Sequence, residues 1–257
     1  MTPELRSARS LAPGERAELF NAAYEGYAVP FHLNVEQMEF MDAAFDLDLD
    51  ASRVAFRDGK PVGLANLGLR GEEAWIGGVG AVAAARRTGV GDSLMRALHE
   101  QAQERGVRRV WLEVIVENSA ALALYEKLGY EVVQDVQVWT LRAAESDAAW
   151  QEAPVTEVQA QLPERHEPWQ RADGTLAHYD DVRGLVTGSG AMLFCVRAGA
   201  QLQRYAGEPE PLIRALRNFG DVYILNLPAD DPAADVLREL GGSVTVRQHE
   251  MLLELEH

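Results

Sequence analysis

Between an apolar segment and a helical segment, the chain reads Arg86-Arg87-Thr88-Gly89-Val90-Gly91. Glycine allows the backbone to turn tightly and to approach a ligand closely. The first N–H groups of the helix that follows have no partner inside the helix, and the helix dipole adds positive potential, so the loop can bind phosphate. It lacks the lysine of the Walker loop and the three glycines of the dinucleotide loop. Taken alone, an ordinary structural turn explains it equally well.

The loop lies in a basic stretch of an acidic protein. The 257 residues carry 24 basic and 40 acidic side chains, which gives a formal net charge of −16. Such a chain is poorly suited to the phosphates of a nucleic acid or to an anionic membrane surface. Residues 86–109 nevertheless carry six arginines against three carboxylates. We therefore expect no nucleic-acid partner, but a small anionic ligand remains compatible with this stretch.

Cross-links, metal ions and membranes are all disfavoured by the composition. Cys195 is the one cysteine, which excludes an internal disulfide and a cysteine-rich metal site. The histidines show no metal-ligand spacing, so we expect no metal. The sequence has neither an apolar run long enough to span a bilayer nor a signal-peptide core, which predicts a cytoplasmic protein without a membrane partner. Residues 255–257 resemble the start of an expression tag.

Strand and helix patterns alternate through residues 1–142. Asp58-Gly59 predicts a tight hairpin, because such turns need positive φ angles. Asn118 and Gly129 are typical of the two ends of a helix. Hydrophobic periodicity predicts helices at 13–27, 35–45, 89–105 and 119–128, and strands at 52–56, 62–69, 74–82, 110–116 and within 130–141.

The second half of the chain resembles the first. Residues 222–253 lie on residues 110–141 at a shift of 112, and Gly241 then corresponds to Gly129. A stretch rich in Ala, Glu, Pro and Gln interrupts the strand and helix patterns between the two halves. We therefore predict two copies of one unit, with domains at 1–142 and 153–257 and a linker at 143–152.

A second group of chemically useful residues surrounds the helix at 119–128. Glu113 lies on a predicted strand, Asn118 begins the helix, and Tyr125 lies two turns into it. Each has a simple structural explanation, since Glu113 fits a solvated strand, Asn118 an N-cap and Tyr125 a packing residue. The interest of the group comes from its combination with the loop.

Together, the loop and this group resemble the GNAT acyltransferase superfamily. Its first motif, Arg/Gln-x-x-Gly-x-Gly/Ala, matches Arg86, Gly89 and Gly91. Its second motif, Asn-x-x-Ala-x-x-x-Tyr-x-x-x-Gly-Phe/Tyr, is matched in full register. Many relatives have a proline three residues before the arginine of the first motif, where this chain has Ala83. The resemblance covers residues 1–142. It implies an α/β fold with a mostly antiparallel sheet flanked by helices, and the internal repeat predicts a partial second GNAT-like unit after it. The second-motif residues are Asn118, Ala121, Tyr125, Gly129 and Tyr130.

The resemblance implies acetyl-CoA, or another acyl-CoA, as the donor. The loop backbone would bind its pyrophosphate, the end of the preceding strand would hold the pantetheine arm and orient the thioester carbonyl, and Asn118 would hydrogen-bond the donor. The expected donor-binding residues are Val79, Gly80, Ala81, Arg86, Arg87, Thr88, Gly89, Val90, Gly91, Asp92, Ser93 and Asn118.

The implied reaction is direct attack of a primary amine, from a small molecule or a peptide, on the thioester. No nucleophile triad is evident, which is compatible with a reaction without an acyl-enzyme. Tyr125 has an ordinary pKa near 10, so it can donate a proton to the leaving thiolate. Glu113 precedes it by twelve residues, a spacing found in relatives resembling the ribosomal-protein alanine acetyltransferase, where that glutamate is the base. Glu73 is the alternative base.

The acceptor side is less well specified. In the family the first two helices and their connection shape it, which here makes Tyr24, Tyr27, Phe31 and His32 the candidate contacts. Four carboxylates follow closely and would suit a cationic amine, although an acidic solvated surface is the commoner explanation for such a run. They are Asp42, Asp46, Asp48 and Asp50.

The second copy has lost the features that the first would use. At the repeat shifts, Pro209 replaces Gly91, and a proline removes a backbone donor. Asp230 replaces Asn118, Leu237 replaces Tyr125 and Leu225 replaces Glu113. We expect a degenerate copy that packs on the first as a second subunit would, within a monomer or a larger oligomer. The alternative to an N-acetyltransferase is a CoA-binding sensor or interaction protein, which would need neither Tyr125 nor Glu113.

Overall fold

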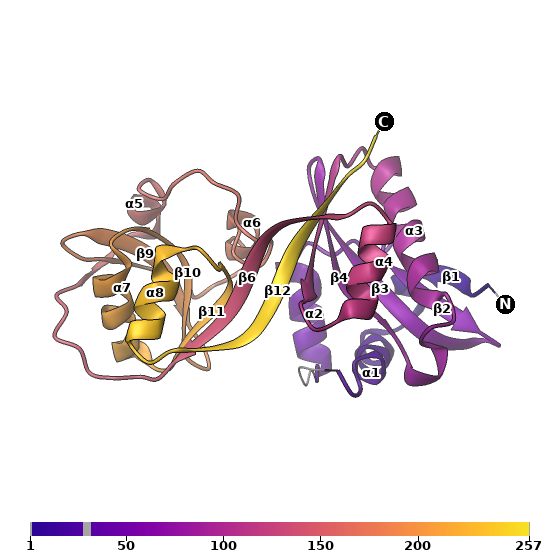
Figure 1. The fold of residues 1–257 in the computed structure, drawn as a ribbon, viewed down its shortest axis with the longest axis horizontal. Coiled ribbons are helices and arrows are strands. Elements are labelled where there is room, and N and C mark those ends of the chain that lie inside the picture. Colours follow the sequence, from indigo (N-terminus) through magenta and orange to yellow (C-terminus); the bar gives the residue numbers. More distant parts are fainter. Residues whose placement is uncertain (1, 28–31, 257) are drawn as a thin grey trace. The chain divides into compact units, whose positions relative to one another are not determined.

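The computed structural model describes residues 2–27 and 32–256, which fold into two compact units (Figure 1). No helix in this described part of the chain is both long and apolar enough to cross a bilayer. Unit 1 consists of Met1–Val114, Asn118–Val132 and Met251–His257, and unit 2 consists of Ile115–Glu117 and Val133–Glu250.

Unit 1 contains a mixed sheet with flanking helices. Its strands are β1 (Glu4–Ser7), β2 (Arg53–Arg57), β3 (Lys60–Arg70), β4 (Glu73–Ala81), β5 (Arg109–Ile115) and the end of β12 (Ser243–Glu254), in that order across the sheet. Its helices are α1 (Pro13–Ala23), α2 (Val35–Ala44), α3 (Val90–Glu104) and α4 (Ser119–Lys127), with 3-10 turns at Ala8–Ser10 and Ala83–Ala85. β4 and β5 run parallel, and β1 to β4 are antiparallel neighbours.

These elements confirm the predicted alternation of strands and helices. The first helix is shorter than predicted and ends at Ala23, because Tyr24 leaves the helical conformation and Gly26 has a φ of 73°. Asp58 and Gly59 both have positive φ values, as the predicted hairpin requires.

Apolar layers cover both faces of the unit 1 sheet. On one face, α1 and α2 pack against β2 and β3 through residues such as Phe20, Met38 and Leu64. On the other face, α3 and α4 pack through residues that include Leu94 and Tyr125. The sheet is thus the middle of three layers, and residues that alternate along β3 to β5 point to opposite helix pairs.

A bulge interrupts β4 where the donor was expected. Leu64 of β3 pairs with Gly80, and Asn66 pairs with Gly77, so two residues of β4, Gly78 and Val79, lie opposite one residue of β3. A bulge leaves backbone groups outside the ladder and bends its strand, and bulges are frequent beside functional sites. Gly78 has a φ of 68°, which glycine adopts without strain.

Unit 2 likewise contains both parallel and antiparallel strand pairs. Its strands are β12, β6 (Glu131–Leu141), β11 (Val222–Pro228), β10 (Ala200–Gly207), β9 (Gly190–Val196), β8 (Arg183–Val186) and β7 (Gln151–Ala153), in that order. Its helices are α5 (Val155–Gln159), α6 (Asp173–Leu176), α7 (Pro209–Leu216) and α8 (Pro232–Glu239), with a 3-10 turn at Arg217–Phe219. β10 and β11 run parallel, as β4 and β5 do in unit 1.

Most of β6 and the end of β12 each belong to the compact unit that holds the other sequence copy. Val133–Leu141 of β6 belongs to unit 2, where β6 pairs with β11. The end of β12 belongs to unit 1, where Met251 is fully buried and the Leu255 N–H donates to the Arg108 carbonyl over 2.8 Å. The compact units therefore cut across the predicted domains at 1–142 and 153–257, which remain a prediction about the sequence copies.

Candidate active site

The loop between β4 and α3 exposes backbone donors. Arg87 and Gly89 both have positive φ values, of 59° and 87°, so the chain turns sharply before α3 begins at Val90. No side chain caps this end of α3. Space around Gly89 is open, whereas a Cβ at Gly91 would lie 3.3 Å from Leu124 of α4. The geometry suits a phosphate group bound by helix N–H groups.

The guanidinium of Arg86 links the end of α1 to the end of β4 through hydrogen bonds. It donates to the Ala81 carbonyl at 3.2 Å, to the Ala23 carbonyl at 3.1 Å and to the Glu25 carbonyl at 2.6 Å. Sequence reasoning assigned Arg86 to the donor phosphate. In the structure its side chain binds three carbonyls, two of which flank Tyr24, and its role toward the donor stays a prediction.

Asp92 connects the start of α3 to α4. Its carboxylate accepts hydrogen bonds from Arg96 at 2.8 Å and from Lys127 at 2.9 Å, and these bonds lower the pKa of Asp92. The contact holds the two helices that carry the loop and Tyr125 next to each other. The donor roles of all the residues named for them stay predictions, namely Val79, Gly80, Ala81, Arg86, Arg87, Thr88, Gly89, Val90, Gly91, Asp92, Ser93 and Asn118.

Glycines form the floor of the sheet face that α1 covers. A Cβ at Gly80 would lie 2.9 Å from the Cβ of Ala23 and 3.4 Å from the ring of Tyr24. A Cβ at Gly78 would lie 3.0 Å from the ring of Phe20. Larger side chains on this stretch of β4 would push α1 away from the sheet. The glycines thus bring the aromatic end of α1 close to the bulge.

Two of the predicted acceptor contacts gather here. Tyr24 stacks on Phe20 with 4.4 Å between ring centroids, and Tyr27 meets the Tyr24 ring edge-on at 5.1 Å. The Tyr27 hydroxyl accepts a hydrogen bond from Asn118 Nδ2 at 3.2 Å, while Asn118 Oδ1 accepts one from the N–H of Ala121. His32 is exposed. The fourth candidate, Phe31, lies outside the described residues.

The carboxylates that follow these contacts bind arginines. The four ion pairs are Arg16–Asp42, Arg70–Asp46, Arg105–Asp48 and Arg9–Asp50. A carboxylate that already binds a guanidinium attracts an incoming amine less strongly. The ion pairs explain this acidic run without a cationic acceptor, since three of them are partly exposed and the pair Arg16–Asp42 is largely buried.

Tyr125 lies in an environment that keeps its hydroxyl protonated. The residue is 8% exposed, and its ring packs 5.8 Å from that of Tyr130. Burial raises the pKa of Tyr125, and the neighbouring Tyr27 raises it further. Deprotonation would leave a buried phenolate, which burial disfavours. The side chain is thus suited to donate a proton.

Glu113 is fixed by a residue that the sequence did not single out. Its Oε2 accepts a hydrogen bond from Trp75 Nε1 at 2.8 Å. The alternative base, Glu73, lies at the start of β4 and binds Arg109 at 2.7 Å. The signal available in the sequence was the Gly-rich composition of residues 74–82. A glycine has no side chain, so it leaves room for a bulky neighbouring side chain over the strand.

Part of the chain matches a known protein family. Residues 18–130 match the sequence model of the Acetyltransferase (GNAT) family. This part of the chain belongs to the GNAT family. A curated relative of the GNAT unit is the ribosomal protein bS18-alanine N-acetyltransferase of Escherichia coli strain K12, which is 47% identical over 45 residues. That match covers 18% of this chain and 30% of the length of the relative.

Solved structures resemble this chain over its whole length. A putative acetyltransferase from Pyrococcus horikoshii has a TM-score of 0.71 at 18% identity and covers 100% of this chain and 90% of its own. A tandem GNAT protein from the clavulanic acid biosynthesis pathway has a TM-score of 0.67 at 16% identity, with 98% of both chains covered. At these identities the likeness shows the fold. The predicted fold class, a GNAT fold followed by a second GNAT-like unit, is confirmed.

The second GNAT-like unit has fewer backbone donors at the equivalent loop. Pro209 and Pro211 have no N–H, and the N–H of Glu208 donates to the Ser189 carbonyl over 3.0 Å. Glu208 and Glu210 add negative charge at the same end of α7. A phosphate would meet repulsion and few hydrogen-bond donors there.

The α8 cap refines the repeat alignment. The shift of 112 places Asp230 opposite Asn118, but the residue that caps α8 is Asp231, whose side chain accepts from the N–H of Ala233 at 2.9 Å. Asp231 also accepts a hydrogen bond from the hydroxyl of Tyr205. A buried carboxylate thus replaces the amide that begins α4.

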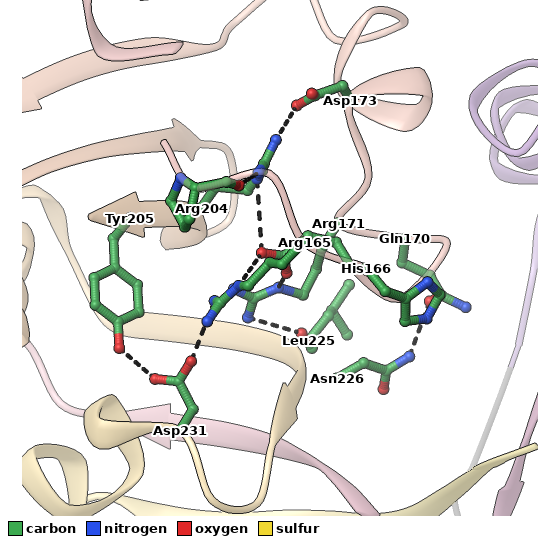
Figure 2. Close-up of polar contacts among 12 residues, drawn as sticks. Arg165, His166, Gln170, Arg171, Asp173, Arg204, Tyr205, Leu225, Asn226 and Asp231 are labelled. Carbon is green, nitrogen blue, oxygen red and sulfur yellow. Dashed lines mark hydrogen bonds and ion pairs between the residues drawn. The ribbon is translucent and has the colours of Figure 1, made fainter. Parts of the chain in front are cut away.

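A charged cluster occupies the place where β10 and β11 stop pairing (Figure 2). The parallel ladder covers Ala200–Gln201 and Val222–Tyr223. Beyond it, Arg204 of β10 lies 3.7 Å from Glu167, and the fully buried Arg171 donates to the Leu225 carbonyl of β11 at 3.4 Å. The loop at 163–172 therefore bridges the two strands with its own side chains. Its further bonds are Arg165–Glu167, Arg165–Asp231 and Asn226–Gln170.

We expect one acetyl-CoA per chain. Unit 1 presents an open helix N-terminus, whereas unit 2 presents prolines, carboxylates and a bridged pair of strands. Isothermal titration of the full chain with CoA should give a stoichiometry near one. Gly89→Pro should remove that binding, because a proline cannot adopt a positive φ. A second CoA site of comparable affinity would contradict the expectation.

Proposed function

We propose that unit 1 moves an acetyl group from acetyl-CoA to a primary amine of a small molecule or a peptide. The observation that supports this most directly is the buried phenol of Tyr125, whose pKa burial raises, on the helix whose Lys127 binds Asp92 at the start of α3. A protein that merely binds CoA has no need of a proton donor at that place. The family of residues 18–130 points to the same chemistry.

The reaction proceeds in a ternary complex. The amine nitrogen attacks the thioester carbonyl carbon, and the carbonyl π electrons move to oxygen. When the carbonyl re-forms, the C–S bond breaks and sulfur takes its electron pair. The thiolate receives the phenolic proton of Tyr125, and the proton lost by nitrogen passes through water to Glu113. The tyrosinate and the glutamic acid then exchange protons with solvent, which restores both residues.

Thiol release tests the function. The purified chain is incubated with acetyl-CoA and a panel of amines, amino acids, polyamines, aminoglycosides and peptides, including peptides with a free N-terminal alanine. Sustained release that depends on one class of amine supports the proposal. Tight CoA binding without turnover across the panel would support the CoA-binding sensor instead. We also propose that the protein acts in the cytoplasm, where acetyl-CoA is available.

Glu113→Gln should lower kcat/KM at neutral pH by about 10²- to 10⁴-fold, the usual contribution of a general base. The base must be ionised, so the wild-type rate falls as the pH is lowered. The variant should lack this acid limb. Glu73→Gln is the matched control, because its carboxylate lies on the neighbouring strand and binds Arg109. Equal losses in the two variants would contradict the role of Glu113.

A further inference from the structure

Trp75 contacts Glu113 across two neighbouring strands. In the parallel ladder of β4 and β5, Trp75 pairs with Trp111, and Glu113 follows two residues later on the same face of the sheet. The indole Nε1 donates to Glu113 Oε2 at 2.8 Å, and Trp75 is 7% exposed. The donor is thus shielded from solvent and directed at a carboxylate.

Gly77 makes this contact possible. A Cβ at position 77 would lie 2.0 Å from Cη2 of Trp75 and 2.2 Å from its Cζ3. No real side chain tolerates such distances, so the indole lies directly on the backbone of its own strand. Phe45, at the end of α2, meets the ring edge-on with 5.2 Å between centroids. The ring is therefore held from both sides.

We propose that Trp75, laid across Gly77, is a positioning residue that orients the Glu113 carboxylate toward the acceptor amine. The inference rests on the proposed function, in which Glu113 is the base. A hydrogen bond to an ionised carboxylate is stronger than one between neutral groups, and it favours the ionised form. Trp75 donates no proton to the reaction. It restricts the rotation of the carboxylate, and loss of its N–H is expected to disfavour the ionised form.

The first experiment follows the ionisation of Glu113 without any acceptor. The protein is labelled with [δ-¹³C]glutamate, and the Glu113 signal is assigned by its loss in Glu113→Gln. Trp75→Phe keeps an aromatic ring and removes the N–H, so the titration midpoint of Glu113 should move to higher pH. Trp139→Phe removes an indole N–H that binds Gln137 in unit 2, and it should leave the midpoint unchanged. An unchanged midpoint in Trp75→Phe overturns the inference.

The second experiment measures turnover with the fastest amine of the panel. Trp75→Phe should lower kcat by about tenfold, the size expected for a lost hydrogen bond to a charged group, while KM for acetyl-CoA stays the same. Its acid limb should move to higher pH. In the Glu113→Gln background, Trp75→Phe should have no further effect. Additive losses would show that Trp75 acts independently of Glu113 and would overturn the inference.

Gly77→Ala supplies a second variant that retains the indole. Its methyl group must displace the ring, so it should reproduce both the titration shift and the loss in kcat. Thermal unfolding and CoA binding of each variant establish that it is folded. If Glu113→Gln leaves turnover unchanged, the proposed base fails. If Glu113→Gln lowers turnover but Trp75→Phe and Gly77→Ala do not, the base stands and the positioning inference fails.

Discussion

A chain that ends at Glu250 should fail to form a stable unit 1. Residues 251–256 fold with that unit, although nearly the whole of it precedes Val133 in the sequence. Met251 is fully buried in the same core as Tyr125 and Tyr130, and Leu253 lies 3.3 Å from the position of a Cβ on Gly129. The truncation removes this packing from the end of α4, which carries Tyr125.

The size of the effect follows from the buried side chains. Replacing a buried methionine by alanine costs about 2–5 kcal/mol, whereas a whole domain is stable by about 5–15 kcal/mol. Loss of the complete strand end also leaves backbone groups such as the Arg108 carbonyl without their partner. We therefore expect denaturant unfolding of the truncated chain to show loss of the unit 1 transition, and acetyl-CoA binding to disappear.

Matched variants separate the strand from the last residues of the chain. Removal of Glu256 and His257 alone should leave unfolding and CoA binding unchanged, because Leu255 still donates to Arg108. In the full-length chain, Met251→Asp should mimic the truncation, and Met251→Leu should be tolerated. A truncated chain with wild-type stability and CoA binding would contradict the assignment of the end of β12 to unit 1.

Tyr125→Phe should lower kcat by about 10²- to 10⁴-fold, the range expected for loss of a general acid. The ring should keep its packing against Tyr130. The dissociation constant of acetyl-CoA should remain unchanged, because the loop that is expected to bind it is intact. Stopped-flow or steady-state thiol release gives kcat, and titration calorimetry gives the affinity.

The pH dependence supplies an independent check of the acid. Burial raises the pKa of Tyr125 above its ordinary value of 10.0, so the group remains protonated up to that pH and beyond. The wild-type rate should therefore show no decline from Tyr125 in the neutral to mildly basic range. A basic limb that lies below pH 10.0 and is lost in Tyr125→Phe would contradict the assignment.

Tyr130→Phe is the control for a buried phenol. Its hydroxyl contacts His99 Nε2 at 2.9 Å, and burial lowers the pKa of His99 to about 4, so the imidazole is neutral at neutral pH. Loss of this hydrogen bond should cost about 1 kcal/mol of stability. Turnover should be nearly unchanged. If Tyr130→Phe lowered kcat as much as Tyr125→Phe, the effect would be one of packing and not of proton donation.

Local sequence patterns predicted much of the secondary structure of unit 1. Two glycines and the start of a helix within six residues predict the loop before α3. The spacing of residues along one helix identifies the motif from Asn118 to Tyr130. Such features depend on neighbours in sequence, so their elements could be predicted without knowledge of the fold. The loss of donors in the second copy was equally visible, because a proline lacks an N–H wherever it lies.

The directions of long side chains were harder to predict from the sequence. Arg86 was expected to bind phosphate, yet three carbonyls at the ends of α1 and β4 accept its hydrogen bonds. Those carbonyls lie near Arg86 because the glycine floor of β4 allows α1 to approach. A long flexible side chain binds whichever partner the tertiary structure brings within reach, and no local pattern states which one that is.

The sequence by itself determined the family motifs, the candidate acid and base, and the repeat of a strand–helix–strand unit. The tertiary structure decided two things that the sequence could not state. Trp75 reaches Glu113 because β4 and β5 are neighbours and Gly77 has no side chain. Most of β6 and the end of β12 each fold with the compact unit that holds the other sequence copy. Both contacts join residues far apart in the chain, and strand propensity specifies that a strand forms but not which strand it pairs with.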